Sequence, residues 1–164
     1  MPIQAVTTYY LEMRDPRALR PKRPGHIGLE IRQAQVPLPE LNRFLYTAVG
    51  GNWYWIDRLG WSYAQWQDWV DRPELQTWVA YVTGTPAGYF ELEAQAGGDV
   101  ELAYFGLIPR FVGMGLGGPL LTAAIEQAWR MGARGACAYP HARPSGIVKL
   151  SSARLRFTAR RPVS

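Results

Sequence analysis

The stretch Pro109-Arg110-Phe111-Val112-Gly113-Met114-Gly115 decides the fold of this 164-residue chain, because the hydrophobic pattern changes period across it. Before it, Val100 to Ile108 reads as a β-strand that Pro109 ends. After it, apolar residues recur at helical spacing until Gly132. These residues are Leu116, Leu120, Leu121, Ala124, Ile125, Ala128 and Trp129. The stretch is therefore predicted to form a glycine-rich turn between a strand and a helix.

Such a turn is suited to binding an anion. Glycine reaches positive φ and lets a ligand approach the main chain, while the free N–H groups and the dipole of a helix start attract negative charge. A pyrophosphate would fit there. Neither of the two common nucleotide motifs is complete here: no Gly-Lys-Ser/Thr follows, and Gly113 to Gly118, which have GxGxxG spacing, are not followed by the distant acid of the dinucleotide-binding motif.

The residues before the turn predict alternating β and α elements. Ile27 to Arg32 alternates like a strand, and Pro39 opens a helix that Gly50-Gly51 stops. Residues 53–70 have mixed helical spacing, which indicates a helical pair with a capping box at Ser62 and Gln65.

Turn residues then separate three further strands. Residues 76–82 and 87–93 flank Thr83-Gly84-Thr85-Pro86 as a hairpin, and Gly97-Gly98-Asp99 leads into the strand before the glycine-rich turn. Nearer the N-terminus, Val6 to Leu11 can form a strand, and residues 14–24 read as a basic, proline-punctuated loop.

The length and composition of the chain exclude several classes of protein. The length fits one domain, and neither an internal disulfide nor a metal site is expected from one cysteine and two histidines. No apolar run approaches the roughly 20 residues of a membrane span, and residues 1–5 lack the plan of a signal peptide, so we expect no membrane partner and a cytoplasmic location.

The net charge of +5 is concentrated in the C-terminal segment. Residues 1–131 carry 11 basic and 13 acidic side chains, a net charge of −2, whereas residues 132–164 carry seven basic side chains and no acid. The body of the chain is therefore not expected to bind nucleic acid.

The segment Glu101 to Leu121 resembles motif A of the GNAT acetyltransferases, whose signature is Gln/Arg-x-x-Gly-x-Gly/Ala. Arg110, Gly113 and Gly115 match it. With the order of elements over residues 25–131, the resemblance implies an α+β fold of the GNAT acyl-CoA N-acyltransferase type. Its mixed, mostly antiparallel sheet is flanked by helices, and the C-terminal part is atypical or missing.

The resemblance also implies how acetyl-CoA, the cosubstrate, is held, with no metal. The N–H groups of Phe111 through Leu116 would hold the pyrophosphate, and the main chain near Phe105 and Leu107 would bind the pantetheine arm like an added strand. The cofactor-binding candidates are Phe105, Gly106, Leu107, Arg110, Phe111, Val112, Gly113, Met114, Gly115 and Leu116.

Glu101 is the candidate general base, because the resemblance places an acid at this point of the strand before motif A in many relatives. An ammonium must lose a proton before its nitrogen attacks a thioester, and a carboxylate of raised pKa can take it. Glu91 and Glu93, which share one strand face, are competitors, and any of the three can instead be a solvent-facing carboxylate.

Several aromatic residues lie where the resemblance places the acceptor pocket. They are Trp53, Tyr54, Trp55, Trp61, Tyr63, Trp66 and Trp69. An aromatic cage for an amine and ordinary helix packing both stay open. Tyr104 and Phe105 either flank the thioester or pack in the core, and Cys137 has no evident partner base that would make it a nucleophile.

After Gly132 the resemblance stops. The family would continue with a splayed strand, a helix that often carries a general-acid tyrosine, and a closing hairpin, none of which the sequence of residues 132–164 indicates. We therefore expect a core at 1–131 and an atypical basic tail at 132–164, which is either the product of a frameshift near Arg134 or a disordered arm. Tyr139, which precedes a proline, does not take the general-acid role.

The function that the resemblance implies is transfer of an acetyl group from acetyl-CoA to an amine by direct attack in a ternary complex. The acceptor would be a small-molecule or peptide amine, and a homodimer is compatible with the family. Two alternatives stay open: a catalytically impaired CoA-binding module with an incomplete C-terminal part, and a nucleic-acid-binding arm on an acyltransferase core.

Overall fold

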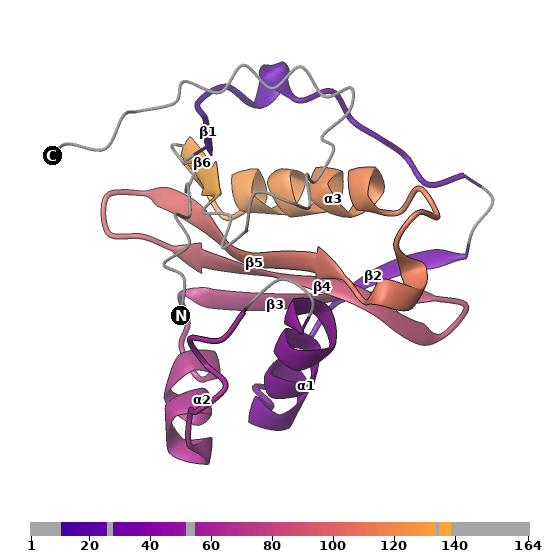
Figure 1. Cartoon of the computed structure of the whole chain (residues 1–164). Coiled ribbons are helices and arrows are strands. Elements are labelled where there is room, and N and C mark those ends of the chain that lie inside the picture. Colours follow the sequence, from indigo (N-terminus) through magenta and orange to yellow (C-terminus); the bar gives the residue numbers. More distant parts are fainter. Residues whose placement is uncertain (1–10, 26–27, 52–54, 134, 139–164) are drawn as a thin grey trace, which may run out of the picture.

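The computed structural model describes residues 11–25, 28–51, 55–133 and 135–138, and within them the chain forms one six-stranded sheet between two helical layers. Helices α1 and α2 cover one face of the sheet, and α3 covers the other (Figure 1). The α+β architecture with a mostly antiparallel sheet, expected from the sequence, is confirmed.

The strand order is β1-β6-β5-β4-β3-β2, and all neighbours are antiparallel except β5 and β6. The strands are β1 (Leu11–Met13), β2 (Leu29–Gln33), β3 (Leu75–Val82), β4 (Thr85–Ala94), β5 (Asp99–Leu107) and β6 (Gly135–Ala138). The predicted hairpin and the meander into β5 are therefore confirmed.

The helices begin and end at local signals that the sequence carries. They are α1 (Pro39–Gly50), α2 (Tyr63–Val70) and α3 (Gly117–Arg130), with short 3-10 turns η1 (Pro16–Ala18) and η2 (Pro109–Phe111). At α2, Ser62 and Gln65 form both hydrogen bonds of the predicted capping box. After α3, Gly132 takes a φ of 82°, which suits glycine at a helix end.

Each face of the sheet has its own core. Beneath α1 and α2 the core is aromatic, and beneath α3 it is largely aliphatic. The aromatic core contains Tyr46, Trp55, Trp66, Tyr89 and Tyr104, whose rings contact one another edge to face or tilted. Because both faces are covered, the middle of β4 is buried continuously from Ala87 to Leu92.

Two predictions about secondary structure were wrong. Residues 53–70 do not form a helical pair: residues 57–60 are a turn that leads to α2, and residues 52–54 lie outside the described part of the chain. A strand does follow Gly132, since β6 pairs in parallel with β5 and antiparallel with β1. Four small residues are too few to alternate, so only long-range pairing reveals β6.

The remainder of the predicted tail, residues 139–164, lies outside the described residues, as do residues 6–10 of the predicted first strand. Within the described ranges, no helix combines the length and the apolar character needed to cross a membrane.

Candidate acyl-donor and acceptor site

Among the described strands, β5 has a neighbour on the β6 side only along its first half. β6 pairs with β5 only from Asp99 to Leu102, and none of the described strands borders β5 on that side between Ala103 and Leu107 (Figure 1). Main-chain N–H and C=O groups on such an edge can pair with an extended ligand as they would with another strand. The candidates Phe105, Gly106 and Leu107 lie on this open edge.

A β-bulge marks the point where β5 and β6 part. In the pairing of β4 with β5, Glu91 is opposite Tyr104 and Leu92 is opposite Leu102, so Ala103 is the extra residue. Ala103 and Tyr104 consequently both face the aromatic core beneath α1 and α2. Bulges redirect side chains and leave main-chain groups unpaired, and both effects are useful beside a reactive centre.

The glycine-rich turn follows η2 at the C-terminal end of β5. Gly113 and Gly115 take φ values of 87° and 76°, and a Cβ added to either would meet nothing within 4 Å. The amides of Gly113 to Leu116 donate to no acceptor among the described residues. Gly117 and Gly118 add two further N–H groups, because the first residues of a helix lack partners within it.

The first two amides of the predicted phosphate-binding set, those of Phe111 and Val112, are already hydrogen-bonded within the protein. The N–H groups of Phe111 and Val112 donate to the carbonyls of Ile108 and Pro109 across 2.9 and 3.2 Å, which closes η2. The free amides therefore run from Gly113 to Gly118, and they lie at an exposed helix start that attracts anions.

Glu101 lies on β5 on the same face of the sheet as Tyr104, because its neighbours Val100 and Leu102 both pack into the core beneath α3. It is half-buried, and its carboxylate accepts a hydrogen bond from Gln95 Nε2 across 3.1 Å. Burial raises the pKa of Glu101, and the charge of Glu93 raises it further, while Arg58 opposes the rise. A raised pKa suits a general base.

The two competing carboxylates, those of Glu91 and Glu93, already have hydrogen-bond and ion-pair partners within the protein. Glu91 is fully buried, and its oxygens accept hydrogen bonds from Asn42 Nδ2 and Trp69 Nε1, each at 2.8 Å. Burial is the main reason that its pKa is raised. Glu93 pairs with Arg72 across 2.8 Å. Of the three, Glu101 is the one whose carboxylate has no cationic partner within the described structure.

An aromatic cage does form, but the protein's own Arg58 fills it. The Arg58 guanidinium carbon lies 3.8, 4.1 and 4.5 Å from the ring centroids of Trp69, Tyr104 and Trp61, and Nη1 lies 3.6 Å from Glu91. Arg58 is only 6% exposed. Cation–π contact and the Glu91 charge compensate for its burial. The aromatic cluster is thus structural here, and Trp53 and Tyr54 lie outside the described residues.

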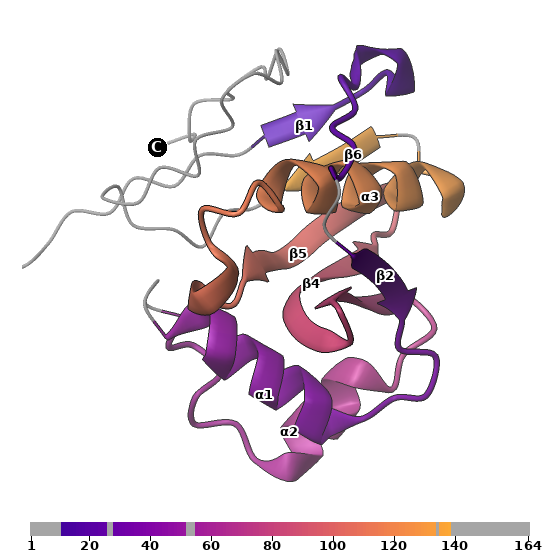
Figure 2. The same cartoon turned by 90° about the vertical axis from the view of Figure 1, so that its right-hand side faces the viewer.

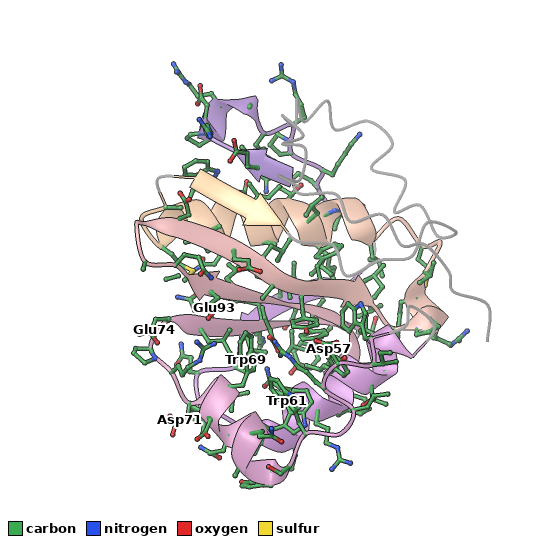
Figure 3. All side chains as sticks on the ribbon, turned by 60° about the vertical axis from the view of Figure 1, so that its left-hand side comes forward. Asp57, Trp61, Trp69, Asp71, Glu74 and Glu93 are labelled. Carbon is green, nitrogen blue, oxygen red and sulfur yellow. The ribbon has the colours of Figure 1, made fainter. Side chains whose placement is uncertain are left out.

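Asp57 is a candidate site residue that the sequence did not suggest. One carboxylate oxygen accepts a hydrogen bond from the Tyr46 hydroxyl at 2.6 Å, and the other accepts one from the Tyr104 hydroxyl at 2.9 Å. Figure 3 shows Asp57 with Trp61 and Trp69 between the sheet and the two helices. An Asp-Arg pair in a loop carries no motif, so nothing in the sequence marked it.

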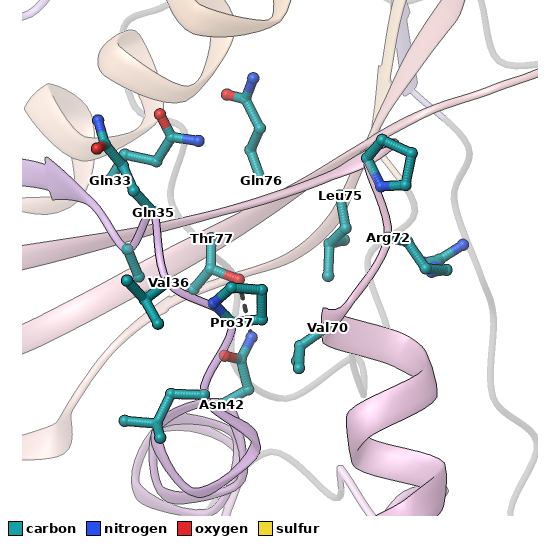
Figure 4. Close-up of a pocket in the computed structure, with 13 residues that line it drawn as sticks. Gln33, Gln35, Val36, Pro37, Asn42, Val70, Arg72, Leu75, Gln76 and Thr77 are labelled. Atoms are coloured by element: carbon teal, nitrogen blue, oxygen red, sulfur yellow. Dashed lines mark hydrogen bonds between the residues drawn. The ribbon is translucent and has the colours of Figure 1, made fainter.

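A separate pocket of about 230 Å³ lies between the segment that joins β2 to α1, the end of α2 and the start of β3 (Figure 4). Amide side chains, among them Gln33, Gln35 and Gln76, line it. Among the lining residues, Asn42 Nδ2 donates to Thr77 Oγ1, and it also donates to Glu91. None of the predicted cofactor-binding residues lines this pocket.

No group of three or more His, Cys, Asp or Glu residues close enough to hold a metal ion occurs in the described part of the chain.

Comparison with known proteins gives a consistent result. A family model described as "Acetyltransferase (GNAT) family" matches residues 40–143. No protein with a curated description matches the sequence significantly.

Solved structures share the fold at low sequence identity. A GCN5-related N-acetyltransferase from Kribbella flavida matches with a TM-score of 0.64 and 19% identity, over 93% of this chain and 54% of that one. Another from Sphaerobacter thermophilus matches with a TM-score of 0.67 and 15% identity, over 93% and 48%. An aminoglycoside N-acetyltransferase in complex with CoA matches with a TM-score of 0.51 and 18% identity, over 70% and 78%.

The chain spans about half the length of the first two of these structures. The fold expected from the sequence is confirmed by these similarities, which by themselves concern architecture.

Proposed function

Because the chain belongs to the GNAT family of acetyltransferases, we propose that it transfers an acetyl group from acetyl-CoA to an amine by direct attack within a ternary complex. The observation that carries the proposal is the continuity of two binding elements. The open edge of β5, from Ala103 to Leu107, leads directly through η2 into the free amides of Gly113 to Gly118.

These two elements fit a long ligand that has an extended amide-bearing arm at one end and a diphosphate at the other. The β5 edge offers main-chain hydrogen bonds to the arm, and the helix start offers N–H groups and a positive dipole end to the phosphates. Acetyl-CoA bound there would supply a thioester carbonyl as the acyl donor. The residues that would hold it are those predicted from motif A, with the amides beginning at Gly113.

In this proposal Glu101 removes the proton that the acceptor ammonium must lose. Its carboxylate lies on the same face of the sheet as Tyr104, which is next to the β-bulge. The side chain is half-buried, and its pKa is raised mainly by burial. A base of raised pKa takes up a proton more readily near neutral pH than an ordinary carboxylate does. Direct attack needs no nucleophile from the protein, so no role is assigned to Cys137.

The same face favours a small cationic amine as the acceptor. Glu101 and Asp57 contribute negative charge there, whereas Arg58 is enclosed by aromatic rings and Arg72 is paired with Glu93. Charge complementarity attracts and orients a cation. Structural neighbours include aminoglycoside N-acetyltransferases, which supports a small-molecule acceptor over a peptide. A cytoplasmic location and a homodimer stay predictions.

Two measurements on the purified chain test the proposal. Thermal shift with acetyl-CoA measures binding, and release of free thiol in the presence of a panel of mono-, di- and polyamines measures turnover. We expect both, with the highest kcat/KM for acceptors that carry more than one positive charge. Binding without turnover by any amine would contradict transfer, and absence of binding would contradict the site itself.

A further inference from the structure

A short basic segment crosses α3 on the side away from the sheet. This strap, residues 20–23, has the sequence Arg-Pro-Lys-Arg. The main-chain N–H of Lys22 donates to Thr122 Oγ1 across 2.9 Å, and Arg23 forms two hydrogen bonds with the Glu126 carboxylate at 2.8 and 3.2 Å. Since Thr122 is buried, the strap is docked on α3 (Figure 2 shows the chain passing from η1 to β2 alongside this helix).

Docking places the side chain of Lys22 over the first turn of α3. A Cβ added to Gly118, the second residue of the helix, would lie 3.1 Å from both Cβ and Cγ of Lys22. That separation is tighter than ordinary van der Waals contact, so the absence of a side chain at Gly118 is what lets Lys22 approach. The lysine is thus held at the helix end that carries the free amides.

The charge of Lys22 is poorly placed for the protein alone. Cations stabilise the C-terminal end of a helix, whereas the N-terminal end already carries a partial positive charge. Lys22 is exposed and has no ion-pair partner among the described residues, whereas its neighbour Arg23 pairs with Glu126. An anion bound between the ammonium and the amides would turn this unfavourable arrangement into a favourable one.

We propose that Lys22 is a phosphate-binding residue of the acetyl-CoA site, acting together with the amides of Gly113 to Gly118. The inference rests on the proposed function and adds a residue from the N-terminal strap to a site otherwise built by β5 and α3. The strap positions the lysine through its main chain, so the ammonium remains available for the ligand. The recognised group is a phosphoryl oxygen, either of the diphosphate or of the 3′-phosphate.

The test compares Lys22→Gln with wild type and with Arg17→Gln. The Arg17 variant is the matched control, because it removes one positive charge from the same N-terminal region, where Arg17 is paired locally with Asp15. For Lys22→Gln we expect the Kd and KM for acetyl-CoA to rise about tenfold, as for loss of one charge-assisted hydrogen bond, with kcat little changed. Arg17→Gln should stay within twofold of wild type.

Comparison of three acyl donors shows which phosphate group of acetyl-CoA Lys22 contacts. If Lys22 contacts the diphosphate, Lys22→Gln loses affinity equally for acetyl-CoA and for acetyl-3′-dephospho-CoA. If it contacts the 3′-phosphate, the loss occurs with acetyl-CoA alone. With acetylpantetheine, which has no phosphate, the variant and wild type should have equal KM values.

The Tm of the ligand-free protein gives a second, independent test of the role of Lys22. Lys22→Gln should not lower the Tm without ligand, because it removes a cation from a positive helix end, yet it should reduce the rise in Tm on adding acetyl-CoA. A Kd for acetyl-CoA within twofold of wild type would overturn the role of Lys22 and leave the proposed function standing. Wild-type protein that fails to bind acetyl-CoA would overturn both.

Discussion

Glu101 lies directly opposite Glu93 in the antiparallel pairing of β5 with β4. Like charges in directly opposed positions repel, and the charge of Glu93 is accordingly one reason that the pKa of Glu101 is raised, after burial. Arg72 pairs with Glu93 and leaves Glu101 with a neutral partner, Gln95. The proposed base is therefore tuned by its neighbour across the strands.

Replacing Glu93 with Gln should move the acid limb of the pH–rate profile to lower pH. The variant removes a charge that raises the pKa of Glu101 and frees the positive charge of Arg72, and both changes favour the ionised base. The measurement is kcat/KM against pH. Glu74→Gln, at an exposed residue before β3, is the matched control and should leave the limb in place. An unshifted limb in Glu93→Gln would rule out Glu101 as the titrating base.

Replacing Glu101 with Gln should lower kcat about 100-fold or more, the usual contribution of a positioned general base. It should also stabilise the protein at neutral pH. A carboxyl group whose folded pKa is raised favours folding only below its unfolded pKa, and that contribution is lost as pH rises through the folded pKa. Tm measured from pH 4 to 8 should therefore fall less steeply with pH in the variant than in wild type. A full kcat would exclude the assigned role.

Replacing Gly113 with Ala should weaken acetyl-CoA binding, because the added Cβ would enter open space beside the turn, which the ligand is proposed to fill, and because the φ of 87° is strained for alanine. Gly97→Ala is the matched control. Gly97 also has a positive φ, 109°, and open space around it, but it lies in the turn between β4 and β5.

Both glycine variants should lose about 1 kcal/mol of unfolding free energy. Only Gly113→Ala should lose affinity, as measured by calorimetric titration. Equal loss in both would mean that the effect comes from stability and that the turn is not the binding site.

Replacing Arg58 with Met should destabilise the protein by about 3–5 kcal/mol, since Glu91 would be left as an uncompensated buried carboxylate. The double variant Arg58→Met with Glu91→Gln should recover part of this loss, because no charge then remains buried. Urea unfolding measures both. Arg32→Met, which breaks an exposed pair with Glu30, should change stability by no more than about 1 kcal/mol. A similarly small change at Arg58 would disprove the structural role of the pair.

Local signals determined much of the framework from the sequence alone. The capping box at Ser62 and Gln65, the hairpin turn at Thr83-Gly84 and the change of period at Pro109 each act over a few residues, and each formed as predicted. The glycine-rich turn is of this kind, because positive φ at Gly113 and Gly115 depends on the residue type. The fold class and the position of the glycine-rich turn therefore followed from short stretches of chain, and the donor site at that turn stays a prediction.

Only the tertiary structure decided how the face beneath α1 and α2 is used. Whether Glu91 or Glu101 is the buried, fully partnered carboxylate depends on Asn42 and Trp69, which are far from both in sequence. Arg58 inside the aromatic cage and Lys22 over Gly118 likewise depend on contacts between distant segments. Periodicity and turn chemistry report backbone conformation over a few residues, whereas burial, charge pairing and pKa are set by whatever the fold brings alongside.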